Sequence, residues 1–325
     1  MRSDRRSLLG AGLSLSGAWA TRGSAGSQAS VAAKPTETIT LWPHGAPGMP
    51  DPAPRERITE RSTDSSFKDR AVAAIAEPRL VVFHPAHASG ASVLLMPGGG
   101  YRHVVVDKEG YEMGRWLAAR GITAFVLFYR LPGDGWAAGP DVALSDAQRA
   151  IRLIRNRAGE WGLDPARVSA MGFSAGGHLC ADLATRFDHG AYDAVDAADT
   201  LSARPDSAAC IYPVISMEPG VAHGGSRDLL IGSDAGAELE RAHSPDQTVP
   251  ANAPPFFLLH AEDDRSVPVE NTLRMRAALK ARDLPVETHL FESGGHGFGL
   301  RKAAGKPVEV WPELWLSWAR TRNFA

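Results

Sequence analysis

Hydrophobic and polar residues follow two patterns along most of this chain, one typical of strands and one typical of helices. Short continuous apolar runs, separated by glycine, proline and charged residues, predict buried strands. These runs are Leu80–Phe83, Ser92–Met96, Thr123–Phe128, Val168–Met171, Ala208–Val214, Pro255–Leu259 and Val286–Phe291.

Between the apolar runs, apolar residues recur three or four positions apart, which predicts amphipathic helices. One such stripe extends from Ala147 to Trp161, with Ser145 and Gln148 as a capping box before it and Gly162 as a stop after it. Two further stripes are Met113, Trp116 and Leu117, ended by Gly121, and Trp311, Leu314, Trp315 and Trp318 near the C-terminus. Aromatic residues at this spacing are more typical of core packing than of a ligand platform.

The alternation of strands and helices predicts an α/β fold with a mostly parallel central sheet and helices on both faces. A chain of 325 residues with 44% hydrophobic residues has enough apolar side chains for a large core. We find no internal repeat and no convincing linker, so residues 38–325 are expected to form a single domain.

Charge and hydropathy narrow the choice of partners. The formal net charge of −2 shows no basic excess, so nucleic acid is not an expected partner. No segment reaches the roughly 20 uncharged apolar residues that a membrane span needs. Charge and hydropathy therefore favour neither a nucleic acid nor a membrane as partner, and they exclude neither a small-molecule nor a polysaccharide substrate.

The first residues carry features of an export signal instead of a folded element. Residues 1–20 combine the pair Arg5-Arg6, an apolar run that begins at Leu8, and the small-residue cleavage pattern Ala18-Trp19-Ala20. The run Arg-Arg-Ser-Leu-Leu resembles a twin-arginine signal. Residues 21–37 are rich in serine, alanine and glycine and are expected to form a flexible leader. We expect an exported protein, periplasmic or secreted; a disordered tail that happens to carry two arginines is the alternative.

The two cysteines, Cys180 and Cys210, are too few for a disulfide scaffold, a thiolate zinc site or a CxxC redox centre. Cys180 falls in a predicted helix and Cys210 in a predicted strand. Buried packing is the expected role of both, because free cysteine behaves as a small hydrophobe. No cofactor and no metal are expected.

One serine stands where a predicted strand becomes a predicted helix. Gly172-Phe173-Ser174-Ala175-Gly176 has the form G-x-S-x-G, and this strand–turn–helix context is the one that a nucleophile elbow requires. Glycine two residues before and two residues after the serine would avoid collisions with the neighbouring strand and helix. The turn would expose the hydroxyl and direct a helix N-terminus towards it. A plain tight turn is the alternative.

A nucleophilic serine needs donors for the negative charge that develops on the substrate oxygen. Pro97-Gly98-Gly99-Gly100-Tyr101 directly follows the strand Ser92–Met96, so its backbone N–H groups meet no side-chain obstruction. This is the position of the HGGG-type loop, with Pro97 in place of the histidine. Gly99, Gly100 and Ala175 are the predicted donors. A phosphate-binding loop is the alternative, but no lysine or Ser/Thr follows at P-loop spacing.

The base and the acid are expected after the serine, in the order serine, acid, histidine. His296 is the favoured base, because it alone among the later histidines lies in a glycine-rich loop just past a strand. His260 and His289 belong to strands and are interpreted as structural, and His178 as a packing or polar contact. The acid is expected after the strand Pro255–Leu259, where three carboxylates compete: Glu262, Asp263 and Asp264.

From about Thr40 onward the chain resembles the α/β-hydrolase carbohydrate esterases of the acetyl xylan esterase and bifunctional feruloyl/acetyl esterase (BD-FAE-like) family. The resemblance rests on LWPHGAPG, VLLMPGGGY, DKEGYEMGRWLAARGITAFVLFYRLP, DAQRAIRLIRNRAGEWGLDPARVSAMGFSAGGHL, PPFFLLHAEDDRSVPVEN and GGHGFG. It implies an α/β-hydrolase fold. The motif D-x-x-V-P places the family's acid on Asp264, G-H-G-F its base on His296, and G-F-S-A-G its nucleophile on Ser174.

The resemblance implies ester hydrolysis by a Ser-His-Asp triad, on acetyl or feruloyl-type esters of polysaccharides or oligosaccharides. Tyr101, the loop that contains Glu109, and the stretch between about Ser216 and Pro255 are candidate walls of the substrate cleft. Two alternatives remain open. One is a serine peptidase of the prolyl-peptidase type, and the other is a non-catalytic carbohydrate-binding protein with a relic triad.

Overall fold

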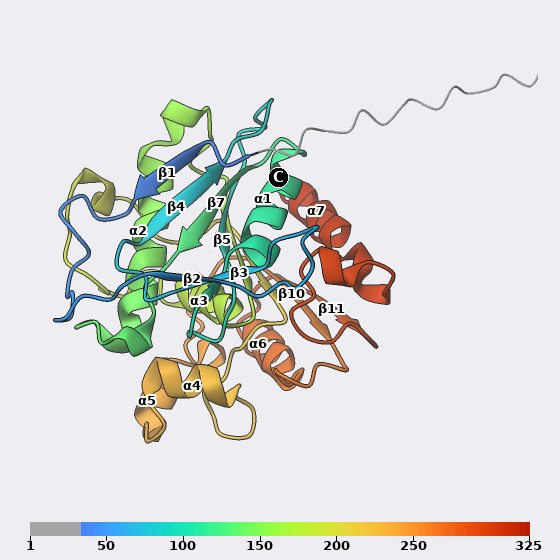
Figure 1. Ribbon diagram of the computed structural model, residues 1–325. Coiled ribbons are helices and arrows are strands. Elements are labelled where there is room, and N and C mark those ends of the chain that lie inside the picture. Colours follow the sequence, from blue (N-terminus) through green and yellow to red (C-terminus); the bar gives the residue numbers. More distant parts are fainter. Residues whose placement is uncertain (1–33) are drawn as a thin grey trace, which may run out of the picture. The chain divides into compact units, whose positions relative to one another are not determined.

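The computed structural model describes residues 34–325 (Figure 1). Within these residues, the central sheet has eight strands in the order β1-β4-β7-β5-β8-β9-β10-β11. The strands are β1 (Glu37–Thr40), β4 (Arg79–Phe83), β5 (Ser92–Met96), β7 (Thr123–Phe128), β8 (Val168–Phe173), β9 (Ala208–Ile211), β10 (Phe256–Ala261) and β11 (Val286–Phe291). Six neighbouring strands of this sheet, β7, β5, β8, β9, β10 and β11, are parallel to one another. Strand β4 pairs antiparallel with both β1 and β7.

Helices flank this sheet on both faces. They are α1 (Glu112–Ala118), α2 (Val142–Asn156), α3 (Ala175–Thr185), α4 (Gly224–Ile231), α5 (Ala237–Ala242), α6 (Glu270–Lys280) and α7 (Trp311–Thr321). Helices α1 and α7 lie together, with the rings of Trp116 and Trp315 6.4 Å apart, while α2 packs on α3 (Figure 1). The mostly parallel sheet with helices on both faces confirms the predicted α/β-hydrolase architecture. None of the helices in residues 34–325 combines the length and the apolar character that crossing a membrane requires.

A second, small antiparallel sheet positions one wall of the site. It is formed by β2 (Arg57–Glu60), β3 (Arg70–Ala73) and β6 (Val104–Val105). Strand β6 lies just after the glycine-rich stretch that follows β5. Arg70 of β3 donates to Asp107 from its backbone N–H and its guanidinium, with distances of 2.7 to 2.8 Å, so this sheet is tied to the turn that follows β6.

The predicted strands are all present, and their bounds differ for identifiable reasons. Strand β9 ends at Ile211, not at Val214, because Tyr212 has φ +39° and Pro213 has no N–H to donate to the ladder. Strand β8 continues to Phe173, directly before the serine. Strand β1 begins at Glu37, which the expected flexible leader had included. The expected export signal at residues 1–20 lies outside the described residues.

The predicted capping box is wrong. Helix α2 begins at Val142, so Ser145 and Gln148 lie inside it. The Ser145 hydroxyl donates to the carbonyls of Asp141 and Ala191, and the Gln148 amide donates to carbonyls in the loop after α3. Both side chains therefore anchor the loop after α3 by hydrogen bonds and do not cap the N-terminus of α2.

The predictions that the C-terminal tryptophans and the two cysteines pack in the core are confirmed. Trp311, Trp315 and Trp318 are buried, and so are Cys180 and Cys210, which are not bonded to each other.

Candidate active site

Ser174 stands at the turn between β8 and α3 in a conformation that side-chain-bearing residues rarely adopt, with φ +54° and ψ −120°. The turn is possible only because its neighbours are small. A Cβ on Gly172 would lie 2.0 Å from the Gly176 carbonyl oxygen, and one on Gly176 would lie 2.1 Å from that of Met96. The geometry is that of a nucleophile elbow at the start of a helix.

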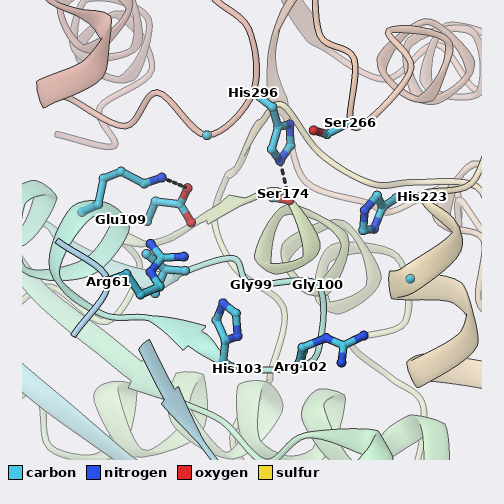
Figure 2. A pocket seen from close by; sticks show the side chains of 14 residues that line it. Arg61, Gly99, Gly100, Arg102, His103, Glu109, Ser174, His223, Ser266 and His296 are labelled. Carbon is cyan, nitrogen blue, oxygen red and sulfur yellow. Dashed lines mark hydrogen bonds and ion pairs between the residues drawn. The ribbon is translucent and has the colours of Figure 1, made fainter. Parts of the chain in front are cut away.

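Three side chains from distant parts of the chain form one hydrogen-bonded row. Ser174 Oγ lies 2.8 Å from His296 Nε2 (Figure 2), and His296 Nδ1 lies 2.6 Å from Asp264 Oδ2. Because a carboxylate only accepts, the proton of His296 sits on Nδ1 and leaves Nε2 free to accept from the serine hydroxyl. The structure thus brings together the three residues that the resemblance singled out.

Asp264 is held as an ionised carboxylate. Its Oδ1 accepts the backbone N–H groups of Ser266 and Val267 at 2.8 and 3.0 Å, and its Oδ2 accepts His260 Nε2 at 3.2 Å in addition to His296. Burial by itself would raise the pKa of Asp264. The hydrogen bonds from His260 and His296 outweigh it and lower that pKa well below the usual range of aspartate. The acid therefore keeps its charge, which orients and stabilises a protonated imidazole.

Asp263, the neighbouring carboxylate, faces a different part of the loop. Its Oδ1 accepts the backbone N–H groups of Gly294 and Gly295 at 2.9 and 2.7 Å. It therefore holds the segment that leads to His296, without touching the imidazole.

The predicted oxyanion loop bends sharply beside Ser174. Gly99 and Gly100 have φ values of +136° and +65°, and a Cβ on Gly99 would lie 2.0 Å from the His103 carbonyl oxygen. Within the described residues, the N–H groups of Gly99, Gly100 and Ala175 donate to no protein acceptor. Both glycines line the cleft above Ser174, so their N–H groups are available for a developing oxyanion.

The cleft has a volume of about 280 Å³, and most of the residues that line it are of polar or charged types. Besides Ser174 and His296, the side chains that line it include Arg61, Arg102, His103, Lys108, Glu109 and His223 (Figure 2). His223 and Gly225 come from the start of α4, so the stretch after β9 forms one wall, as expected. In residues 34–325, no three His, Cys, Asp or Glu side chains are grouped so as to hold a metal ion.

Comparison with known proteins places this geometry in a family. The BD-FAE family model matches residues 80–279. The chain belongs to the BD-FAE family.

Named relatives of this BD-FAE chain are carboxylic ester hydrolases or xylan-degrading enzymes. It is 33% identical over 227 residues to an acetylxylan esterase of Xylanibacter ruminicola, an alignment that covers 68% of this chain and 44% of the relative. It is 35% identical over 205 residues to endo-1,4-beta-xylanase B of Butyrivibrio fibrisolvens, with 63% of this chain and 32% of the relative covered. The chain therefore spans less than half the length of either curated relative.

A solved structure matches over nearly its whole length. The acetyl ester-xyloside bifunctional hydrolase of Caldicellulosiruptor lactoaceticus superimposes with a TM-score of 0.73 and 33% identity, covering 91% of this chain and 99% of that one. An esterase of Thermogutta terrifontis, with a TM-score of 0.63 and 24% identity, shares the fold. These comparisons show that the BD-FAE domain is similar to proteins named as esterases and hydrolases.

The prediction that Tyr101 lines the substrate cleft of this BD-FAE chain is wrong. Tyr101 is 1% exposed, and its hydroxyl lies 2.6 Å from His178 Nδ1 in the core. Tyr101 has a φ of +58° and does not line the cleft. His178 Nε2 in turn lies 2.8 Å from the carbonyl oxygen of His243, so His178 is the polar contact that the sequence indicated.

Glu109 does line the cleft, but its oxygens already accept hydrogen bonds from the protein. The sequence does not identify every residue of the site. His260 is structural, as predicted, but it also contacts Asp264, and its position at a strand end, four residues before Asp264, is a signal for that role. Arg61, which lines the cleft, directly follows the exposed strand β2, where no motif marks it.

Proposed function

We propose that the protein hydrolyses carboxylic esters of carbohydrates, acetyl or feruloyl-type, by a serine mechanism without metal. Ser174 is the nucleophile, His296 the general base and Asp264 the residue that orients it. The observation that carries the proposal is the hydrogen-bonded row from Ser174 through His296 to Asp264, at 2.8 and 2.6 Å, beside the free N–H groups of Gly99 and Gly100.

In the first step, Ser174 Oγ bonds to the ester carbonyl carbon while its proton moves to His296 Nε2. The carbonyl oxygen takes up the negative charge and accepts hydrogen bonds from the N–H groups of Gly99, Gly100 and Ala175. The intermediate then collapses, the ester C–O bond breaks, and the leaving alcohol takes the proton from His296.

In the second step, water replaces the alcohol. His296 takes a proton from the water as it attacks the acyl-enzyme, and returns that proton to Ser174 Oγ as the carboxylic acid leaves. The ionised Asp264 stabilises the imidazolium in both steps, and its lowered pKa supports this role.

The substrate class is supported by the relatives and by the cleft. One relative is named as an acetylxylan esterase and one structural neighbour as an acetyl ester-xyloside hydrolase. The lining side chains of Arg102, His103 and His223 offer hydrogen bonds to a hydroxyl-rich leaving group. An export signal at residues 1–20 would suit a polymer-derived substrate outside the cytoplasm, and we propose export by the twin-arginine route.

The decisive experiment measures acetate and ferulate released from a panel of acetylated and feruloylated xylans and oligosaccharides. Release of acetate, ferulate or both is expected, together with stoichiometric labelling of Ser174 by a fluorophosphonate. Labelling with no release from any carbohydrate ester would contradict the substrate class. Cleavage of prolyl peptide substrates in its place would favour the peptidase alternative, and absence of labelling would favour a relic site.

A further inference from the structure

A second buried carboxylate lies beside the nucleophile, and the triad does not use it. Glu109 belongs to the π-helical turn Asp107–Tyr111 and is 3% exposed. Its Oε2 accepts the Gly98 N–H at 2.7 Å, and its Oε1 accepts the Tyr212 hydroxyl at 3.0 Å. Lys108 Nζ lies 3.8 Å from Oε1. All three partners have a proton to donate, and the oxygens of an ionised carboxylate only accept hydrogen bonds, so the partners suit a carboxylate at this position.

Tyr212 continues the chain of hydrogen bonds to another loop. Its hydroxyl accepts the Gly299 N–H at 3.1 Å, so the phenolic proton points to Glu109. Burial and the neighbouring Glu109 raise the pKa of Tyr212, and the phenol keeps its proton. The Tyr212 ring also packs edge-on against His296, with ring centres 5.1 Å apart.

The two ends of this chain belong to the two halves of the site. Gly98 lies in the oxyanion loop so close to the nucleophile that a Cβ on it would lie 2.9 Å from Ser174 Cβ. Gly299 is three residues after His296, in the loop that carries the base. The path Gly98–Glu109–Tyr212–Gly299 therefore spans from the oxyanion donors to the base.

We propose that Glu109 is a positioning residue that, through Tyr212, keeps the oxyanion loop in register with the loop of His296. The proposal rests on the serine mechanism proposed above. Donors and base must both meet the same tetrahedral carbon, so a small shift of one loop relative to the other misplaces a group in the transition state. Misplacement of about 1 Å can cost roughly 100-fold in rate.

Glu109→Gln tests the bridge with little change of volume. If the glutamine carbonyl accepts from Gly98, its NH₂ group faces the Tyr212 hydroxyl, which must turn its proton away and accept a second N–H, and Lys108, which only donates. The link to Tyr212 is then weakened, and Lys108 loses its counter-charge. Tyr212→Phe removes that link and keeps the ring against His296.

The experiment is a double-mutant cycle of these two substitutions with p-nitrophenyl acetate as substrate. The concentration of active sites is measured by fluorophosphonate labelling run to completion, and kcat is calculated per labelled site, so that misfolded protein does not contribute to it. We expect each single variant to lower kcat by about 10- to 100-fold with KM within about threefold. The double variant should fall no more than about threefold below the worse single one, because both changes break the same bridge.

Tyr129→Phe is the matched control. Its hydroxyl is equally buried and donates to the Pro97 carbonyl at 2.8 Å, on the same oxyanion loop but with no link to the loop of His296. The fold-losses in kcat of Tyr129→Phe and Glu109→Gln should multiply in the variant that carries both substitutions.

An unchanged kcat per labelled site, a loss expressed mainly in KM, or multiplying effects of Glu109→Gln and Tyr212→Phe would each overturn the bridge. Failure of the parent protein to label or to turn over would instead contradict the proposed serine mechanism.

Discussion

Replacing Asp264 with asparagine tests the proposed orienting acid, because the two carboxylate oxygens of Asp264 have different partners. Oδ1 accepts the backbone N–H groups of Ser266 and Val267, and Oδ2 accepts His296 and His260. An asparagine that keeps the two backbone bonds must place its NH₂ group where Oδ2 was.

That NH₂ group then meets the Nδ1–H of His296, donor against donor. The imidazole relieves the conflict by moving its proton to Nε2, the atom that must accept the proton of Ser174. In serine proteases, the same wrong tautomer costs roughly 10⁴ in kcat, or about 5.4 kcal/mol at 1.36 kcal/mol per tenfold. We expect a loss of this size in Asp264→Asn.

The control is Asp263→Asn. Asp263 accepts only the N–H groups of Gly294 and Gly295, and an amide oxygen can accept both, so we expect less than a tenfold loss. Both variants are assayed on p-nitrophenyl acetate, with thermal unfolding to show that each is folded. If Asp263→Asn shows the larger loss of kcat, or if Asp264→Asn keeps more than about a hundredth of the parent kcat, the assignment of the acid is wrong.

Three other predictions use independent measurements. Ser174→Ala should lower kcat on p-nitrophenyl acetate by roughly 10⁴- to 10⁶-fold while the protein stays folded, and retention of a tenth of the activity would contradict the nucleophile. Burial lowers the pKa of His178 from 6.5 to about 4, so between these pH values the unfolded chain binds a proton that the folded protein does not, and stability falls as the pH falls. In urea unfolding, His178→Gln should therefore lose about 2 kcal/mol less than the parent between pH 7 and pH 5; equal losses would refute this origin. Replacing Arg5 and Arg6 with lysine should leave the precursor in the cytoplasm, whereas unchanged export would exclude the twin-arginine route.

The sequence predicted the fold well where burial is continuous and poorly where it is not. Strands covered on both faces appear as apolar runs, and each of the seven predicted runs corresponds to a strand, including the antiparallel β4 and the partly exposed edge strand β11. Strand β2 was missed because all four of its residues are exposed, and β6 because it is only two residues long.

The site divides in a similar way. Ser174, Asp264 and His296 each lie in a short motif that marks a turn or loop after a strand, so local sequence pointed to them. Glu109 and Tyr212 are 103 positions apart, and only packing decides that their side chains meet. The prediction for Tyr101 is wrong because its hydroxyl meets His178, 77 positions away, in the core, and local sequence does not reveal such a contact.

The two buried carboxylates near Ser174 also explain why backbone amides suit the proposed oxyanion hole. A cationic side chain placed there would be drawn to Asp264 or Glu109, as Lys108 is already drawn to Glu109 at 3.8 Å. Burial lowers the pKa of Lys108, so a second buried cation would be costly as well. The N–H groups of Gly99 and Gly100 carry no net charge and are fixed by the backbone, so neither carboxylate draws them away, although Glu109 accepts the N–H of the neighbouring Gly98. They remain free for a charge that exists only during the reaction, and this requires a loop as sharply bent as the one that Gly99 and Gly100 form.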